Sequence, residues 1–122
     1  MRVLICDDEK DIREVIKIHL QSLNCGCIEA SNGSECYAKA QDLHPDIIYL
    51  DLSMPNVSGY TAHSMLRGNP NTRHIPVVII TGSCPLTARL MKTAGVIEKP
   101  FTKEELILET IQALVKYGRI VI

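Results

Sequence analysis

The pattern of apolar residues switches repeatedly between short continuous runs and helical spacing along this chain. Short runs that are apolar throughout are typical of strands buried on both faces, whereas apolar residues every three to four positions are typical of a helix with one buried face. Strands of the first kind that alternate with such helices predict a parallel sheet covered by helices on both sides. This pattern therefore places the fold in the α/β class.

The same pattern predicts five strands and five helices in alternation. Strands are expected at residues 2–6, 26–30, 46–50, 76–81 and 96–98. Helices are expected at residues 9–23, 33–43, 59–67, 85–94 and 103–117. Helical spacing in the first and last helices turns these side chains toward the core: Ile12, Val15, Ile16, Leu20, Leu23, Ile107, Ile111 and Leu114. Thr102 and Glu105 have the spacing of a capping box, which fixes the start of the last helix.

Length and composition predict a single soluble domain, residues 1–122. A chain of 122 residues can bury one core but not two. The net charge is −1 and no lysine- or arginine-rich block occurs, so we expect no nucleic-acid binding by this chain alone. The apolar runs are too short to cross a membrane, and a strand-like run follows Met1 in place of a signal-peptide stretch. We therefore expect a cytoplasmic protein.

The chain has five cysteines, and their number and spacing favour reduced thiols. An odd number without secretory context does not predict a disulfide framework. Cys25 and Cys27 have the spacing of half a zinc site, but no second pair of ligands occurs at a matching spacing. We therefore expect the cysteines to pack as small apolar residues.

Polar residues that carry chemistry occur at four of the predicted strand ends. They are Asp7, Asp8 and Glu9 after the first strand, Asp51 after the third, Thr81 at the end of the fourth and Lys99 after the fifth. In an open α/β sheet, ligands bind beyond the carboxyl ends of the strands. We therefore expect carboxylates, a hydroxyl and an ammonium group to converge at one edge of the sheet.

Such a cluster suits a divalent cation and a phosphoryl group. Carboxylates this close repel one another unless a cation lies between them, and Mg²⁺ takes one or two carboxylates, keeps several waters and binds a phosphate oxygen. A carboxylate can also attack phosphorus and form an aspartyl phosphate, a transfer that depends on positioning and charge neutralisation. Lys99 would neutralise the added charge, and Thr81 would hydrogen-bond a phosphoryl oxygen. Each residue alone is usually structural, so this prediction depends on their combination.

Four segments resemble the signatures of response-regulator receiver domains of the chemotaxis CheY type. They are the opening run 3–9, the run 46–59 with its Asp-x-x-Met-Pro-x-x-x-Gly spacing, the run 75–82 that ends in Thr-Gly, and the run 98–101, Glu-Lys-Pro-Phe. The resemblance covers nearly the whole chain. It implies a doubly wound, flavodoxin-like (βα)5 receiver fold with five parallel strands in the order 2-1-3-4-5.

The resemblance also implies the phosphoacceptor and its metal ligands. Asp51 matches the phosphorylated residue. Asp8 matches the direct ligand of Mg²⁺, Asp7 matches the acidic partner that acts through water, and Ser53 matches the position whose backbone carbonyl binds the metal. Asp51 is itself expected at the metal.

The remaining site residues and the partners follow from the same resemblance. Thr81 matches the hydroxyl that turns toward the phosphoryl group, Lys99 matches the lysine that pairs with it, and the Lys99–Pro100 bond is expected to be cis. The family implies a sensor histidine kinase or phosphotransfer protein as donor, and an output protein or domain that responds to a change of conformation. It implies no enzymatic turnover beyond self-catalysed phosphotransfer and autodephosphorylation.

The chain departs from the receiver pattern in two places. The stretch from Thr81 to Lys99 is a few residues shorter than usual, and Val96 stands in or near the position of an aromatic residue that normally responds to phosphorylation. We therefore expect residues 82–95 to carry more of any response. Ser53 and Ser83, both small, occupy the two variable positions that tune the lifetime of the phosphoryl group.

Three other functions fit parts of this pattern. A phosphorylation-independent adaptor could share the fold, but the acidic and basic site residues are all present. A haloacid-dehalogenase-type phosphatase also forms an aspartyl phosphate, but it needs Asp-x-Asp after the first strand, where Asp7 and Asp8 are adjacent; turnover of p-nitrophenyl phosphate would favour it. A flavodoxin-like binder needs a phosphate loop there, but carboxylates repel phosphate; colour on purification would favour it.

Overall fold

The structure is a computed structural model that describes residues 1–82 and 85–121, and these residues form five strands and five α-helices. The strands are β1 (Arg2–Cys6), β2 (Gly26–Ala30), β3 (Ile47–Asp51), β4 (Val77–Thr81) and β5 (Gly95–Glu98). The helices are α1 (Lys10–Leu20), α2 (Gly33–Leu43), α3 (Gly59–Gly68), α4 (Pro85–Leu90) and α5 (Lys103–Lys116), and a single 3-10 turn, η1 (Gln21–Leu23), follows α1.

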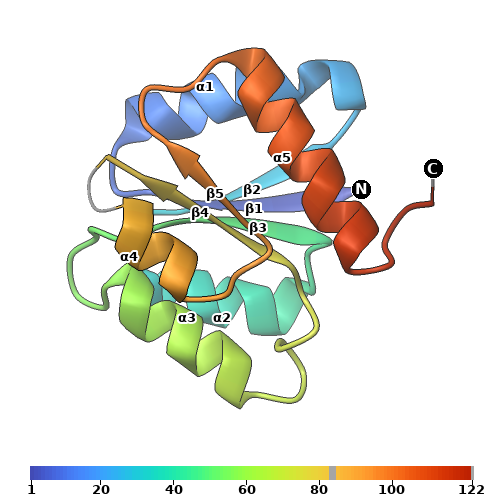
Figure 1. Cartoon of the computed structure of the whole chain (residues 1–122). Coiled ribbons are helices and arrows are strands. Elements are labelled where there is room, and N and C mark those ends of the chain that lie inside the picture. The colour runs from blue at the N-terminus through green and yellow to red at the C-terminus, as the bar shows by residue number, and fades with distance from the viewer. Residues whose placement is uncertain (83–84, 122) are drawn as a thin grey trace.

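All neighbouring strands are parallel, and their order across the sheet is β2-β1-β3-β4-β5. This arrangement confirms the predicted doubly wound fold and its strand order. Helices α1 and α5 cover one face of the sheet, and α2, α3 and α4 cover the other (Figure 1). Both ends of the chain lie at the same end of the sheet in that view.

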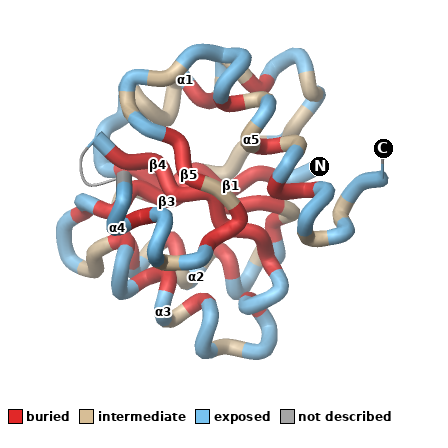
Figure 2. The backbone as a smooth tube through the Cα atoms, viewed as in Figure 1, coloured by how far each residue is buried: buried red, intermediate tan, exposed pale blue. Residues whose placement is uncertain are grey.

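The central strands are buried on both faces because their side chains alternate between two cores. In β3, Ile48 and Leu50 pack with α2 and α3, whereas Ile47 and Tyr49 pack with α1 and α5. The tube is red through most of the sheet and mostly pale blue on the outer faces of the helices (Figure 2). This double burial explains why the strands have continuous apolar sequences.

Side-chain caps fix where three of the helices begin. Asn32 accepts a hydrogen bond from the amide of Glu35 at the start of α2, and Ser58 accepts one from Thr61 at the start of α3. The predicted capping box of α5 is present, since Thr102 and Glu105 each bind the other's backbone amide. These caps place the loops that precede the helices.

The helical spacing predicted the buried face of α5 only in part, since Leu114 is buried as predicted but the other two predicted residues are not. Leu106, Thr110 and Ala113 are fully buried, whereas Ile107 and Ile111 are only partly covered. The reason is a pair of hydrogen bonds. The Thr110 hydroxyl is hydrogen-bonded to the buried Tyr49 hydroxyl and donates to the carbonyl of Leu106. A threonine that completes the bonding of a buried tyrosine turns this face inward.

Two smaller differences concern α1 and α4. The α-helical part of α1 ends at Leu20, before the 3-10 turn, and Val15 is 37% exposed rather than inward. Helix α4 ends at Leu90 rather than near Ala94, because the amide of Ala94 already bonds Val77 O at the start of β4. No helix in the described part of the chain is long and apolar enough to cross a membrane.

Candidate functional site

The strand register brings the predicted site residues to one edge of the sheet. Cys6 pairs with Leu50, so Asp7 and Asp51, the next residues, emerge side by side. Thr81 pairs with Glu98 at the end of β4, and Lys99 follows directly. The edge therefore assembles groups from four strands that lie far apart in the sequence.

The ammonium group of Lys99 lies among three carboxylates. Its Nζ atom is 2.9 Å from Oδ2 of Asp7, 3.5 Å from Oε1 of Glu9 and 3.8 Å from Oδ1 of Asp51. Asp7 and Asp51 are buried, at 1% and 4% exposure, whereas Glu9 is exposed. Lys99 is thus held closer to Asp7 than to the predicted phosphoacceptor.

Burial, and to a lesser degree the charge of neighbouring carboxylates, raises the pKa of both buried carboxyl groups. Burial, followed by the charge of Asp7, raises the pKa of Asp51 to about 6 against the opposing charge of Lys99. Burial also raises the pKa of Asp7, although the amide of Glu9 and Lys99 oppose this. Burial would lower the pKa of Lys99, but its acidic neighbours raise it, with Asp7 contributing most. The site therefore has too little positive charge for its carboxylates.

The residues of this cluster fit a small divalent cation. Asp7, Asp8 and Asp51 each offer a carboxylate oxygen, and these atoms lie within 4.8 Å of one another. Oδ2 of Asp7 is buried and receives no aligned hydrogen bond from the described residues; its close contact is the ion pair with Lys99. Asp8 is exposed, which leaves an open approach from solvent. Oxygen ligands, surplus negative charge and access to water are the properties of a Mg²⁺ site.

A tight loop after β3 holds Asp51 in place. A Cβ atom on Gly59 would lie 2.1 Å from the carbonyl oxygen of Asp51, so only glycine lets α3 begin this close to the strand. The amide of Gly59 donates to Leu52 O at 3.0 Å. Asn56 has a positive φ of 66°, which asparagine tolerates better than most residues. Ser53 is exposed, and its backbone amide donates a hydrogen bond to Oδ1 of Asp51 at 3.4 Å.

The other predicted features of the site lie on β4 and β5. Thr81 is buried at the end of β4, and its carbonyl accepts the amide of Lys99 at 2.7 Å. The Lys99–Pro100 bond is cis, as predicted. Val96 is buried and packs in the core beneath α4. Ser83 lies outside the described residues, as does Cys84.

Two further residues contact Asp7 at this edge: Glu9, which was predicted among the polar strand-end residues but without a role, and Arg13, which was not predicted. Glu9 contributes an ion pair to Lys99 and an amide that donates to Oδ1 of Asp7 at 2.9 Å. Arg13 donates from Nη1 to the carbonyl of Asp7 at 2.7 Å. The sequence feature that could have identified them is their position: both residues closely follow Asp7 and Asp8, on the segment that leads from the site into α1.

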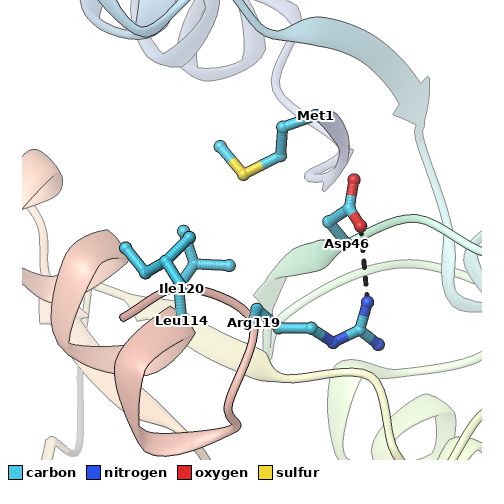
Figure 3. Close-up of a pocket in the computed structure, with 5 residues that line it drawn as sticks. All are labelled: Met1, Asp46, Leu114, Arg119 and Ile120. Carbon is cyan, nitrogen blue, oxygen red and sulfur yellow. Dashed lines mark hydrogen bonds and ion pairs between the residues drawn. The ribbon is translucent and has the colours of Figure 1, made fainter. Parts of the chain in front are cut away.

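A pocket of about 300 Å³ lies at the opposite, amino-terminal edge of the sheet. Met1, Asp46, Leu114, Arg119 and Ile120 line it, and Arg119 is 3.3 Å from Asp46 in an ion pair (Figure 3). Asp46 also accepts the amide of Arg2 at 2.8 Å. The carboxylate there already has partners, so this pocket lacks the surplus negative charge found at the carboxyl-terminal edge.

Known proteins resemble this chain in sequence and in fold. Residues 3–111 match the family described as the response regulator receiver domain. The Pseudomonas aeruginosa protein PilG is 32% identical over 111 residues, which cover 88% of this chain and 82% of PilG. The solved structure of the chemotaxis response regulator CheY4 of Vibrio cholerae has a TM-score of 0.84 and 27% identity, over 93% of this chain and 98% of CheY4.

The strand order and the acidic edge therefore define an α/β protein of the CheY-like class. The chain belongs to the response regulator receiver domain family. Longer relatives contain a similar segment: the DNA-binding dual master transcriptional regulator RpaA of Synechocystis is 32% identical over 119 residues, which are 94% of this chain but 49% of RpaA.

Proposed function

We propose that this chain is a single phosphoacceptor domain, residues 1–122, which receives a phosphoryl group on Asp51 in a two-component phosphorelay. The observation that carries the proposal is the buried pair of Asp7 and Asp51 at the edge of the central strands, with Lys99 within 4 Å of both. A buried carboxylate beside a cation can act as a nucleophile toward phosphorus.

The transfer replaces one bond to phosphorus with another. A carboxylate oxygen of Asp51 bonds to phosphorus while the phosphorus–nitrogen bond of a donor phosphohistidine breaks. The electron pair of that bond stays with the imidazole nitrogen, which takes up a proton. Deprotonated Asp51 is required for the attack, and its pKa of about 6 leaves the carboxylate form dominant at neutral pH.

The neighbouring residues position the new group and balance its charge. Asp8 would bind Mg²⁺ directly, Asp7 would act on it through water, and Asp51 and the backbone carbonyl of Ser53 would be the other protein ligands. Bound Mg²⁺ neutralises the carboxylates and the developing charge on the phosphoryl oxygens. Lys99 offers a compact charge with three donors that can leave Asp7 for a phosphoryl oxygen.

Thr81 and the segment after it would carry the response. The Thr81 hydroxyl turns toward a phosphoryl oxygen, and its backbone is joined to Lys99 by a short hydrogen bond, so the two residues move together. Val96 is too small to change exposure by a change of rotamer, so residues 82–95 carry the shift instead. A sensor histidine kinase or phosphotransfer protein supplies the phosphoryl group, and an output partner in the cytoplasm reads the changed surface.

A phosphorylation-independent adaptor is the principal alternative. The buried Oδ2 atom of Asp7 argues against it: among the described residues this atom has the ion pair with Lys99 but no aligned hydrogen bond, and a site that never binds a cation would be expected to lose such a charge. A phosphatase of the haloacid-dehalogenase type is disfavoured by the family to which the chain belongs.

Labelling with acetyl phosphate and Mg²⁺ tests the proposal. The wild-type chain should gain one phosphoryl group, and Asp51→Asn should gain none. Asp46→Asn is the matched control, because Asp46 lies just before the other end of β3, and it should be labelled like the wild type. Labelling of Asp51→Asn at the wild-type level would refute Asp51 as the acceptor.

A further inference from the structure

Arg13 connects strand β2 to the loop that carries the acidic cluster. Its Nε atom donates to Oε1 of Glu29 at 2.9 Å, and its Nη1 atom donates to the carbonyl oxygen of Asp7 at 2.7 Å. The Arg13 side chain is largely buried, at 15% exposure. An arginine fork presents these two donors in a fixed plane, so the position of Glu29 determines the position of the donor to Asp7.

The hydrogen bond from Arg13 completes the fixation of Asp7. The amide of Asp7 donates to Ala30 O at 3.1 Å, and its Oδ1 atom accepts the amide of Glu9 at 2.9 Å. The carbonyl held by Arg13 belongs to the same peptide plane as the amide nitrogen of Asp8. Arg13 therefore restrains the peptide plane through which the chain passes from one predicted metal ligand to the next.

Glu29 holds Arg13 and is itself held from the other side. Its second oxygen, Oε2, lies 3.0 Å from Nζ of Lys17, which also pairs with Glu14 at 2.8 Å. Each oxygen of Glu29 thus has its own cationic partner, and only the partner of Oε1, Arg13, continues to Asp7. Lys17 shares the partner of Arg13, but no hydrogen bond or ion pair joins it to Asp7 among the described residues.

We propose that Arg13 is a positioning residue for the acidic site, that it orients the Asp7–Asp8 peptide for cation binding, and that Glu29 orients Arg13. The proposal rests on the proposed function, since Mg²⁺ is the cation expected at Asp7, Asp8 and Asp51. It concerns residues outside the ligand set, which act through the backbone.

Charge and positioning predict opposite effects on Mg²⁺ binding. Removal of a positive charge near a cation site favours binding of the cation, because repulsion is lost. Loss of a hydrogen bond that orients a ligand weakens binding, on the order of tenfold for groups behind a metal ligand. The sign of the change therefore separates the two roles.

The first experiment measures Mg²⁺ affinity by titration calorimetry for the wild type, Arg13→Gln, Arg13→Lys and Lys17→Gln. Arg13→Gln should bind Mg²⁺ about tenfold more weakly. Lys17→Gln removes the same charge from the same partner and should bind as tightly as the wild type or slightly more tightly. Arg13→Lys keeps the charge but not the fork, so it should bind more weakly than the wild type. Equal affinities in Arg13→Gln and Lys17→Gln would overturn the positioning role while leaving the proposed function intact.

The second experiment uses the metal-free protein and does not depend on Mg²⁺ binding. It follows hydrogen exchange at the amide of Glu9, which bonds Oδ1 of Asp7, with the core amide of Ile48 as the reference for global opening. Exchange at Glu9 relative to Ile48 should quicken about tenfold in Arg13→Gln and stay unchanged in Lys17→Gln. If the wild type binds no Mg²⁺, the proposed function fails, and this ratio alone decides whether Arg13 holds the loop: an unchanged ratio refutes it.

Discussion

Burial, followed by the charge of Asp7, raises the pKa of the Asp51 carboxyl group above its ordinary value. The same surplus of negative charge that helps to raise this pKa is what would favour binding of a cation in the proposed function. A site that binds Mg²⁺ and a phosphoryl group has surplus negative charge without them. The repulsion between its carboxylates then lowers the stability of the folded state.

Stability without Mg²⁺ should therefore depend on pH through Asp51. Its pKa is about 6 when folded and about 3.9 when unfolded, so the folded state binds more protons between these values. The free energy of unfolding thus falls as the pH rises from about 4 to about 6. Asp51→Asn removes this loss, and urea unfolding in a chelator should show it about 1–3 kcal/mol more stable than the wild type at pH 8.

The gain in Asp51→Asn should vanish as the pH falls below about 4, where both states of the wild-type residue are protonated. Asp46→Asn provides the control, because Asp46 already has bonds from Arg2 and Arg119 and should gain no stability at pH 8. A gain in Asp51→Asn that is the same at every pH would show that charge at this position is not its cause.

Asp8 and Glu9 are adjacent exposed carboxylates with different predicted roles. Asp8 belongs to the cluster of oxygens within 4.8 Å, whereas Glu9 pairs with Lys99. Calorimetry should show that Asp8→Ala weakens Mg²⁺ binding at least tenfold, because a direct anionic ligand is lost. Glu9→Gln removes a neighbouring charge and keeps the amide that bonds Asp7, so it should change the affinity by less than about threefold. Equal losses of Mg²⁺ affinity in both variants would mean that Asp8 acts only through its charge and is not a direct ligand.

At the scale of the elements, the start of α3 determines the position of the phosphoacceptor loop. A methyl group on Gly59 would meet the backbone of Asp51 and Leu52, at 2.1 and 2.6 Å, and neither can move without shifting β3 or the loop. Gly59→Ala should therefore lower the free energy of unfolding by about 2–3 kcal/mol or more. Urea unfolding measures this directly.

Gly68, at the other end of the same helix, is the control for that substitution. A Cβ atom there meets nothing within 4 Å. Gly68→Ala should leave stability unchanged or raise it by up to about 1 kcal/mol, since alanine is the better helix former. Similar losses in both variants would mean that the close approach at Gly59 does not constrain the loop.

Element order, strand positions and the residues at strand ends were predictable because they depend on local pattern. Apolar runs such as Ile47–Leu50 are buried on both faces, and a parallel sheet must bring its carboxyl ends together. The strand order itself was carried over by resemblance to the receiver family. The inward face of α5 was not predictable from periodicity, because the pairing of Thr110 with Tyr49 joins residues 61 positions apart.

The same distinction holds for the site. Asp7, Asp51, Thr81 and Lys99 could be predicted to converge because each follows or ends a strand. The contact of Arg13 with Asp7 could not, since it depends on the direction in which Glu29 on β2 holds the guanidinium group. Strand ends are set by pattern, whereas the orientation of a long side chain is set by its tertiary neighbours.

At the scale of the whole molecule, the acidic edge and the two chain ends lie at opposite ends of the sheet (Figure 1). A phosphoryl group can shift the domain only through contacts that differ between its two states. The short segment between β4 and β5 contains α4, with Leu86 and Leu90 exposed at 71% and 72%. A movement of α4 would change this apolar surface, which any output partner could read.

Hydrogen exchange with and without beryllofluoride, a phosphoryl mimic, tests where the response occurs. With Mg²⁺ present, protection should change most within residues 82–97, because Val96 offers no large side chain to move and the backbone must shift instead. Lys99→Ala, which removes the cation that would bind the mimic, should lose this change. A response confined to residues 7–11 and the Asp51 loop would favour the adaptor function.

The most direct test of the central claim is chemical identification of the modified residue. The wild-type chain is treated with acetyl phosphate and Mg²⁺, then with borohydride, which reduces an aspartyl phosphate to homoserine, and its peptides are sequenced by mass spectrometry. We expect homoserine at position 51, only when Mg²⁺ is present, and an unmodified carboxylate at Asp7, Asp8 and Asp46. Homoserine at another of these positions, or none at position 51 in a chain that has taken up phosphate, would contradict the assignment of Asp51 as the phosphoacceptor.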